Sequence, residues 1–179
     1  MSGGWDNNIF LYDVRKKTPI SFLHGPHTVG DSIEFVDEDT LLTGSFTTSH
    51  GLQTWDLKKM EMIQDIEWNA GLDEDNFSSH DYPRINFAKV TRSSKKMNML
   101  IAGGDTDEIR VFDKDFKPMV SINGMSRSTF TCDTNKRGDV VAIGGGDGVI
   151  RVFRLGIISS SFLQLVSLQV LSLTLQQSP

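Results

Sequence analysis

The sequence predicts an all-β fold made of short antiparallel strands, and three observations support this prediction. Short apolar runs alternate with polar residues and are rich in β-branched and aromatic side chains. Gly, Asp, Asn and Pro separate these runs, as they do at turns between strands. The same group of runs recurs along the chain, and no stretch before residue 155 has a helical period.

An aromatic residue near the end of one apolar run gives the period of the repeat. These residues are Tyr12, Trp55, Phe112 and Phe153, and they are 43, 57 and 41 residues apart. Two of the spacings fit the roughly 40–45 residues of a four-stranded propeller blade. The middle spacing is longer, which predicts a loop insertion at 67–83 between two repeats.

Each repeat contains four expected strands in the same order. The first covers 31–36, 84–90 and 128–133, and the second ends in small residues at 40–45, 99–104 and 140–145. The third carries the aromatic residue, at 9–13, 52–56, 109–113 and 150–154. The fourth follows a polar turn, at 19–24, 61–66 and 118–123. Only the third and fourth strands of the first repeat are expected, because Met1 falls at the preceding turn.

These units resemble WD40 repeats. The segment LQTWDL (52–57) carries the Trp-Asp pair, and LYDV and VFDK are relaxed forms of it. The resemblance implies a WD40-type β-propeller, here an incomplete arc of about three to four four-stranded blades over residues 1–155. The expected blade segments are 1–26, 27–67, 84–124 and 125–155. We expect a piece of a larger propeller or the product of an incomplete gene model. The alternative is a ring closed by a second copy.

The glycines of GGGDGVIRVFR (144–154) lie where the second strand turns into the third. Small residues there allow neighbouring sheets to approach closely, and glycine supplies the positive φ that a tight turn needs. A phosphate-binding loop is not expected, because no Lys-Ser/Thr follows and the next element is a strand rather than a helix.

The resemblance also implies a structural hydrogen-bond network within a blade. In the family, an Asp of this turn joins a histidine, a Ser/Thr and the Trp of the third strand. The matching residues in this chain are Asp6, His27, Trp55 and Asp147, with Thr43 or Ser45 as the hydroxyl. Such a network satisfies buried polar groups, so we assign these residues a structural role rather than a catalytic one.

The insertion is the main candidate for recognition. In the family, its position lies on the same face as the turn between the second and third strands, here 46–51. Loops on rigid scaffolds carry recognition, and Trp and Tyr dominate interface hot spots. The alternative is a solvated acidic loop. The candidate protein-binding residues are Phe46, His50, Trp68, Asp73, Asp75 and Tyr82.

Metal binding is not expected in this loop. A calcium loop needs an oxygen ligand at its fifth position and glycine at its sixth, where this sequence has Phe77 and Ser78. His50 and His80 are not at zinc-ligand spacing. We therefore predict no metal and no cofactor.

Charge and cysteine content limit the partners and the compartment. The net charge is −5 and no basic stripe occurs, so nucleic acid is not an expected partner. The single cysteine, Cys132, fits a strand residue in a reducing compartment, the cytoplasm or alternatively the nucleus. No basic and apolar leader follows Met1, so we expect no signal peptide.

The tail at 156–179 is apolar and uncharged, and its structure is left open. It is interpreted as a strand, a disordered tail or residues translated past the true coding end. A membrane span is disfavoured because Ser and Gln dilute the segment and no Lys or Arg follows it.

The sequence therefore predicts a non-catalytic protein–protein interaction scaffold. One alternative is a subunit of a large assembly, such as a substrate receptor of a cullin ubiquitin ligase or a ciliary or trafficking complex. The fragment YDVR, with Arg15, resembles the adaptor-docking signal of such receptors. A remote alternative is a propeller hydrolase with an axial metal, although the inner strands offer mainly Ser32, Glu34, Asn86 and Thr131.

Overall fold

The protein is all-β, as the sequence predicts. A computed structural model describes residues 1–70, 82–93, 96–159 and 162–172, and all the regular secondary structure in these ranges is β-strand. The strands form four antiparallel sheets, and within each sheet they pair in chain order. No helix in the described ranges has the length and apolar character that crossing a membrane requires.

The strands follow the expected repeat, except that the first sheet has three strands where only two were expected, because Ser2–Gly3 also pairs with the strand at 8–12. The first sheet contains β1 (Ser2–Gly3), β2 (Asn8–Tyr12) and β3 (Pro19–His24). The second contains β4 (Ile33–Phe35), β5 (Thr40–Gly44), β6 (Leu52–Asp56) and β7 (Glu61–Asp65). The third contains β8 (Ile85–Ser93), β9 (Lys96–Gly104), β10 (Ile109–Phe112) and β11 (Pro118–Ile122). The fourth contains β12 (Thr129–Thr134), β13 (Val140–Gly145), β14 (Val149–Ser159) and β15 (Phe162–Ser172).

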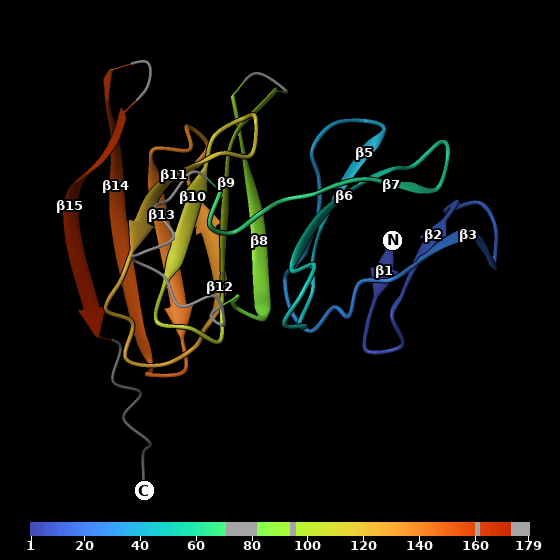
Figure 1. The fold of residues 1–179 in the computed structure, drawn as a ribbon, viewed down its shortest axis with the longest axis horizontal. Helices are drawn as coiled ribbons and strands as arrows, with labels where there is room; N and C mark the ends of the chain where they lie inside the picture. Colours follow the sequence, from blue (N-terminus) through green and yellow to red (C-terminus); the bar gives the residue numbers. More distant parts are fainter. Residues whose placement is uncertain (71–81, 94–95, 160–161, 173–179) are drawn as a thin grey trace, which may run out of the picture.

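The four sheets lie side by side in chain order, from the blue N-terminal sheet to the red C-terminal one (Figure 1). The first strands of the second, third and fourth sheets are joined directly. The side chain of Lys89 on β8 forms an ion pair with Glu34 on β4, with 2.7 Å between Nζ and Oε1. Asn86 on β8 donates from Nδ2 to the carbonyl oxygen of Thr129 on β12 at 2.8 Å. Strands β4, β8 and β12 therefore form one row of neighbouring strands.

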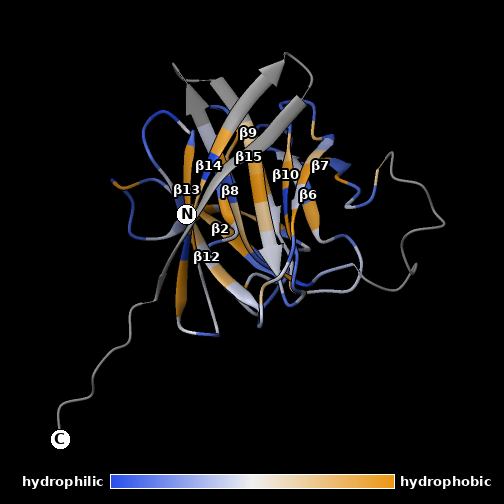
Figure 2. Ribbon diagram, turned by 90° about the vertical axis from the view of Figure 1, so that its left-hand side faces the viewer, coloured by the Kyte–Doolittle hydropathy of each residue, from blue (hydrophilic) through white to orange (hydrophobic). Residues whose placement is uncertain are grey.

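The hydrophobic core lies between successive sheets. Side chains alternate across each strand, so one set of residues faces the next sheet and the other faces the previous one. Three clusters result, one for each pair of neighbouring sheets. Apolar strand segments run through the middle of the molecule and hydrophilic turns lie at its ends (Figure 2). Fully buried members include Ile9, Leu41, Leu100, Phe112 and Phe153.

The glycines that end the second strands allow close packing, as the sequence predicts. A Cβ atom at Gly44 would lie 2.5 Å from Cγ2 of Ile85 on the neighbouring sheet. At Gly104, it would lie 1.9 Å from the carbonyl oxygen of Arg84, which precedes β8 in the same sheet, so this glycine allows close packing within a sheet. The turn glycine Gly148 has a φ of 72°, in the left-handed region that glycine adopts without strain.

The C-terminal segment is a strand over most of its described length. Strand β14 continues past residue 155 to Ser159, and β15 pairs with it from Val149↔Ser172 to Ser159↔Phe162. A strand is one of the three interpretations of the tail, and here it supplies the fourth strand of the last sheet. The free N–H and C=O groups along the edge of β14 explain why an uncharged segment can pair there without a repeat signature of its own.

Candidate functional site

A pocket opens between the second and third sheets, on the face where the sequence places the recognition loops. Its volume is about 260 Å³. Its walls come from the turn after β5, the start of β6, the residues that end and follow β7, and the segment that leads into β8. The lining residues are Thr48, Ser49, His50, Gly51, Leu52, Asp65, Ile66, Glu67, Trp68, Tyr82, Pro83 and Ile85.

Backbone hydrogen bonds fix these walls relative to one another. Ser45 N donates to Gly51 O at 2.8 Å and closes the turn between β5 and β6. Ile66 N donates to Leu52 O at 2.9 Å, which ties the end of the β7 segment to β6. Ile85 N donates to Ser45 O at 2.9 Å and joins the start of β8 to the same turn. The pocket is therefore held by main-chain bonds from both sheets.

The polar edge of the pocket is organised by Asp65. Its Oδ2 lies 2.7 Å from Nδ1 of His50, and its Oδ1 accepts a 2.8 Å hydrogen bond from Nε2 of Gln53. His50 has a φ of 55°, a left-handed conformation that turns its side chain toward β7. The sequence singles out His50 but not Asp65 or Gln53, which are ordinary strand residues until the fold brings them together.

Trp68 is a buried wall residue and not an exposed contact, contrary to the sequence interpretation. Its side chain is only 3% exposed. Its ring meets Phe112 edge-on with 5.7 Å between centroids, and Nε1 donates to Oε2 of Glu108 at 3.3 Å. A residue of the insertion at 67–83 was expected on a protein-binding face, but here the indole completes the core between the second and third sheets.

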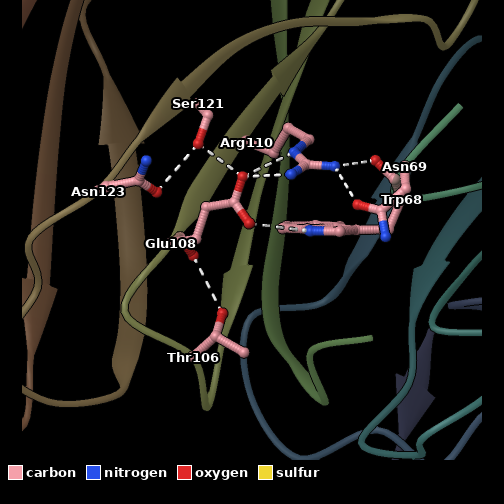
Figure 3. Close-up of polar contacts among 7 residues, drawn as sticks. All are labelled: Trp68, Asn69, Thr106, Glu108, Arg110, Ser121 and Asn123. Carbon is pink, nitrogen blue, oxygen red and sulfur yellow. Dashed lines mark hydrogen bonds and ion pairs between the residues drawn. The ribbon is translucent and has the colours of Figure 1, made fainter. Parts of the chain in front are cut away.

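Arg110 on β10 holds this wall in place (Figure 3). Its guanidinium is 1% exposed and lies 4.9 Å from the centroid of the Trp68 ring. Nη1 donates to the carbonyl oxygen of Trp68 and, at 2.8 Å, to Oδ1 of Asn69. Nε donates to Oε1 of Glu108 at 2.9 Å, and Nη2 donates to the same oxygen. Glu108 also accepts from Ser121 Oγ at 2.6 Å.

The Arg110 network was not predicted from the sequence. The segment EIRVFD nevertheless contains a sequence signal for this network, because Arg110 lies between two apolar strand residues. The third strand of each later repeat carries a polar residue at this position, and each one contacts a carboxylate. Gln53 contacts Asp65, Arg110 contacts Glu108, and Arg151 contacts Asp147.

The remaining candidate binding residues are distributed as follows. Tyr82 is 40% exposed and lines the pocket. Phe46 is not among the lining residues, and its ring lies 5.6 Å from the guanidinium carbon of Arg84. Asp73 and Asp75 lie outside the described residues. The structure therefore brings His50, Trp68 and Tyr82 to one pocket.

Among the described residues, the members of the predicted blade network make separate contacts and not one connected network. Trp55 donates from Nε1 to Oγ1 of Thr43 at 2.9 Å, as the resemblance implies. His27 instead lies 2.8 Å, through Nδ1, from Oδ1 of Asn7, and its backbone N–H donates to Ser45. Asp6 accepts from the backbone N–H of Asn8 at 3.2 Å, which caps a local turn. A fixed period in sequence does not fix which neighbouring side chain a polar atom reaches.

Asp147 forms its own cluster at the turn before β14. It forms an ion pair with Arg151, with 2.7 Å between Oδ2 and Nη2, and accepts from Ser126 Oγ at 2.7 Å. Its Oδ1 accepts from the backbone N–H of Val149 at 3.1 Å. The hydrogen bond from Arg151, followed by that from Ser126, holds the pKa of Asp147 well below its usual range.

This lowered pKa predicts a loss of stability in acid. A carboxylate whose pKa is lower in the folded than in the unfolded state stabilises the fold above its unfolded pKa of about 3.9. The stabilisation is lost progressively as the pH falls below about 5. Urea unfolding of Asp147→Asn at a series of pH values is expected to show a flatter acid limb than the wild type, with Ser126→Ala intermediate. An unchanged slope in Asp147→Asn would contradict the assignment.

Cys132 lies in β12 with its thiol buried, in keeping with a structural strand residue. Burial raises the pKa of the thiol to about 12, so it stays protonated at neutral pH. Within the described ranges, no three His, Cys, Asp or Glu side chains are grouped so that they could hold a metal ion.

Comparison of the chain with models of protein families gives no match, and comparison with curated protein sequences gives none either.

Proposed function

We propose that this chain is an arc of a WD40-type β-propeller that acts in the cytoplasm as a non-catalytic protein-interaction module. Three features support the propeller assignment: the repeat period, the Trp-Asp pair at Trp55 and Asp56, and the row of neighbouring first strands β4, β8 and β12. In such an arrangement the loops at one end of the sheets offer a surface for a protein partner.

The observation that carries the binding role is the pocket between the second and third sheets. It is concave, its walls are fixed by main-chain bonds, and the partly exposed ring of Tyr82 lies at its edge. A rigid pocket with an aromatic residue at its edge is suited to anchoring a side chain of a partner, because little conformational entropy is lost on binding.

A peptide-display selection on the immobilised chain tests this proposal. We expect the wild type to enrich random peptides that no longer bind after His50→Asn or Tyr82→Ala. Asparagine tolerates the left-handed backbone at position 50, and Tyr82 is at the surface, so both variants should fold. The control is Val14→Ser, which changes a fully exposed apolar residue away from the pocket and should leave binding unchanged.

Two results would contradict the proposal. The first is enrichment no greater than on an unrelated protein. The second is a set of peptides that bind the two pocket variants as well as the wild type. Stoichiometric metal in the purified protein, measured by elemental analysis, would instead favour a metal-dependent hydrolase.

A further inference from the structure

We infer that this pocket receives a basic side chain, an arginine or a lysine, from the bound partner. The inference rests on the proposed binding function and specifies its chemistry. The pocket, at about 260 Å³, is smaller than the roughly 300–1,000 Å³ of sites for drug-sized molecules. A single long side chain is therefore a better match than a whole small molecule.

The charge of the lining favours a cation. Two carboxylates, Asp65 and Glu67, line the pocket, and the described lining includes no Lys or Arg. Asp65 already accepts from His50 and Gln53, but a carboxylate has about four acceptor positions, so it retains capacity. Glu67 is exposed, and within the described ranges no hydrogen bond or ion pair occupies its side chain.

The apolar walls fit the stem of the same side chain. Leu52, Ile66 and Ile85 are buried residues that line the pocket beneath its polar edge. Arg and Lys place their methylene groups along such surfaces while the charged head stays at the polar end. Tyr82, at the edge, offers an aromatic face, with which a guanidinium interacts favourably.

Other occupants fit less well. An anion would meet two carboxylates without a Lys or Arg of the described lining to balance them. A purely apolar side chain would desolvate Asp65 and Glu67 and offer them no hydrogen bond, which is costly. A basic side chain satisfies both the apolar walls and the carboxylates.

An NMR titration of the full ¹⁵N-labelled chain with capped amino acids tests the inference. The probes are N-acetyl-arginine methylamide, N-acetyl-lysine methylamide, N-acetyl-citrulline methylamide and N-acetyl-leucine methylamide. Citrulline keeps the shape of arginine but carries no charge. We expect arginine and lysine to shift the amide resonances of Gly51, Leu52, Ile66 and Glu67 saturably, and citrulline to bind several-fold more weakly. Added salt should weaken the arginine effect.

Two variants locate the effect. Glu67→Gln is expected to weaken arginine binding by about two- to fivefold, within the range for an exposed charge pair. Glu38→Gln removes an exposed carboxylate away from the pocket and should leave binding unchanged.

The outcomes separate this inference from the proposed function. If citrulline and leucine shift the pocket amides as much as arginine does, the basic anchor is wrong while the binding function stands. If no probe shifts these amides, the basic anchor is also overturned, and the display selection decides independently whether the chain binds peptides.

Discussion

Replacing Arg110 by methionine is expected to lower the free energy of unfolding by about 3–5 kcal/mol. The guanidinium is fully buried, and it is the donor for the Trp68 carbonyl oxygen, the Asn69 side chain and Glu108. Methionine retains much of the apolar volume of the stem but leaves the Glu108 carboxylate without its cation. Removing one partner of a buried ion pair is costly for this reason. Urea unfolding monitored by tryptophan fluorescence measures the change.

A matched series separates the buried charge from the loss of packing. Arg15→Met removes an arginine that also pairs with a carboxylate, that of Asp13, but its side chain is 84% exposed, so we expect a change within about 1 kcal/mol. Arg110→Met combined with Glu108→Gln removes the unpaired charge, and should recover at least 1 kcal/mol relative to Arg110→Met alone. Equal costs at Arg110 and Arg15 would show that the network in Figure 3 does not hold the fold together.

The same series bears on the pocket. Arg110 bonds to the backbone of Trp68, and Trp68 is one wall of the site. If the pocket binds a ligand as proposed, Arg110 would act on it as a positioning residue, through the segment that follows β7. Arg110→Lys keeps the charge but loses the planar fork that reaches several acceptors at once. Because the lysine keeps a positive charge beside Glu108, Arg110→Lys should retain more stability than Arg110→Met.

The sheets could be predicted from the sequence because their signals are local. Alternation of apolar and polar residues and the recurrent turn residues specify strands such as β5 and β6 without reference to the rest of the chain. Strand β15 has no such signature, and its pairing depends on the free edge of β14. From the sequence, a strand in this segment was therefore only one of three alternatives.

The site was predicted only in part, because its contacts join residues far apart in the chain. His50 and Tyr82 were singled out by residue type and by their position in loops, and both line the pocket. Asp65 joins His50 across 15 positions, and Arg110 joins Trp68 across 42. Spacing alone does not reveal such pairs. The burial of Trp68 was misjudged for the same reason, since Phe112 and Arg110 cover it from another sheet.

Replacing Gly104 by alanine is expected to lower the free energy of unfolding by about 1–3 kcal/mol, the range for an overpacked core site. The added methyl group would lie 1.9 Å from the carbonyl oxygen and 2.8 Å from the carbonyl carbon of Arg84. Both are backbone atoms, so no side-chain rotation relieves the clash. Strand β9 would have to move away from Ile85, its register partner at this end of the sheet. Urea unfolding measures the cost.

The control is Gly144→Ala, near the end of β13. A methyl group there would have Cγ2 of Thr131 as its nearest neighbour, at 3.4 Å, an ordinary contact. Alanine also reduces the entropy of the unfolded chain, so this variant is expected to be neutral or stabilised by up to about 1 kcal/mol. If both variants cost the same, the effect belongs to glycine in strands generally and not to the close approach of the Arg84 backbone to β9. Because Ile85 lines the pocket, Gly104→Ala should also shift the amide resonances of the β5–β6 turn, whereas Gly144→Ala should not.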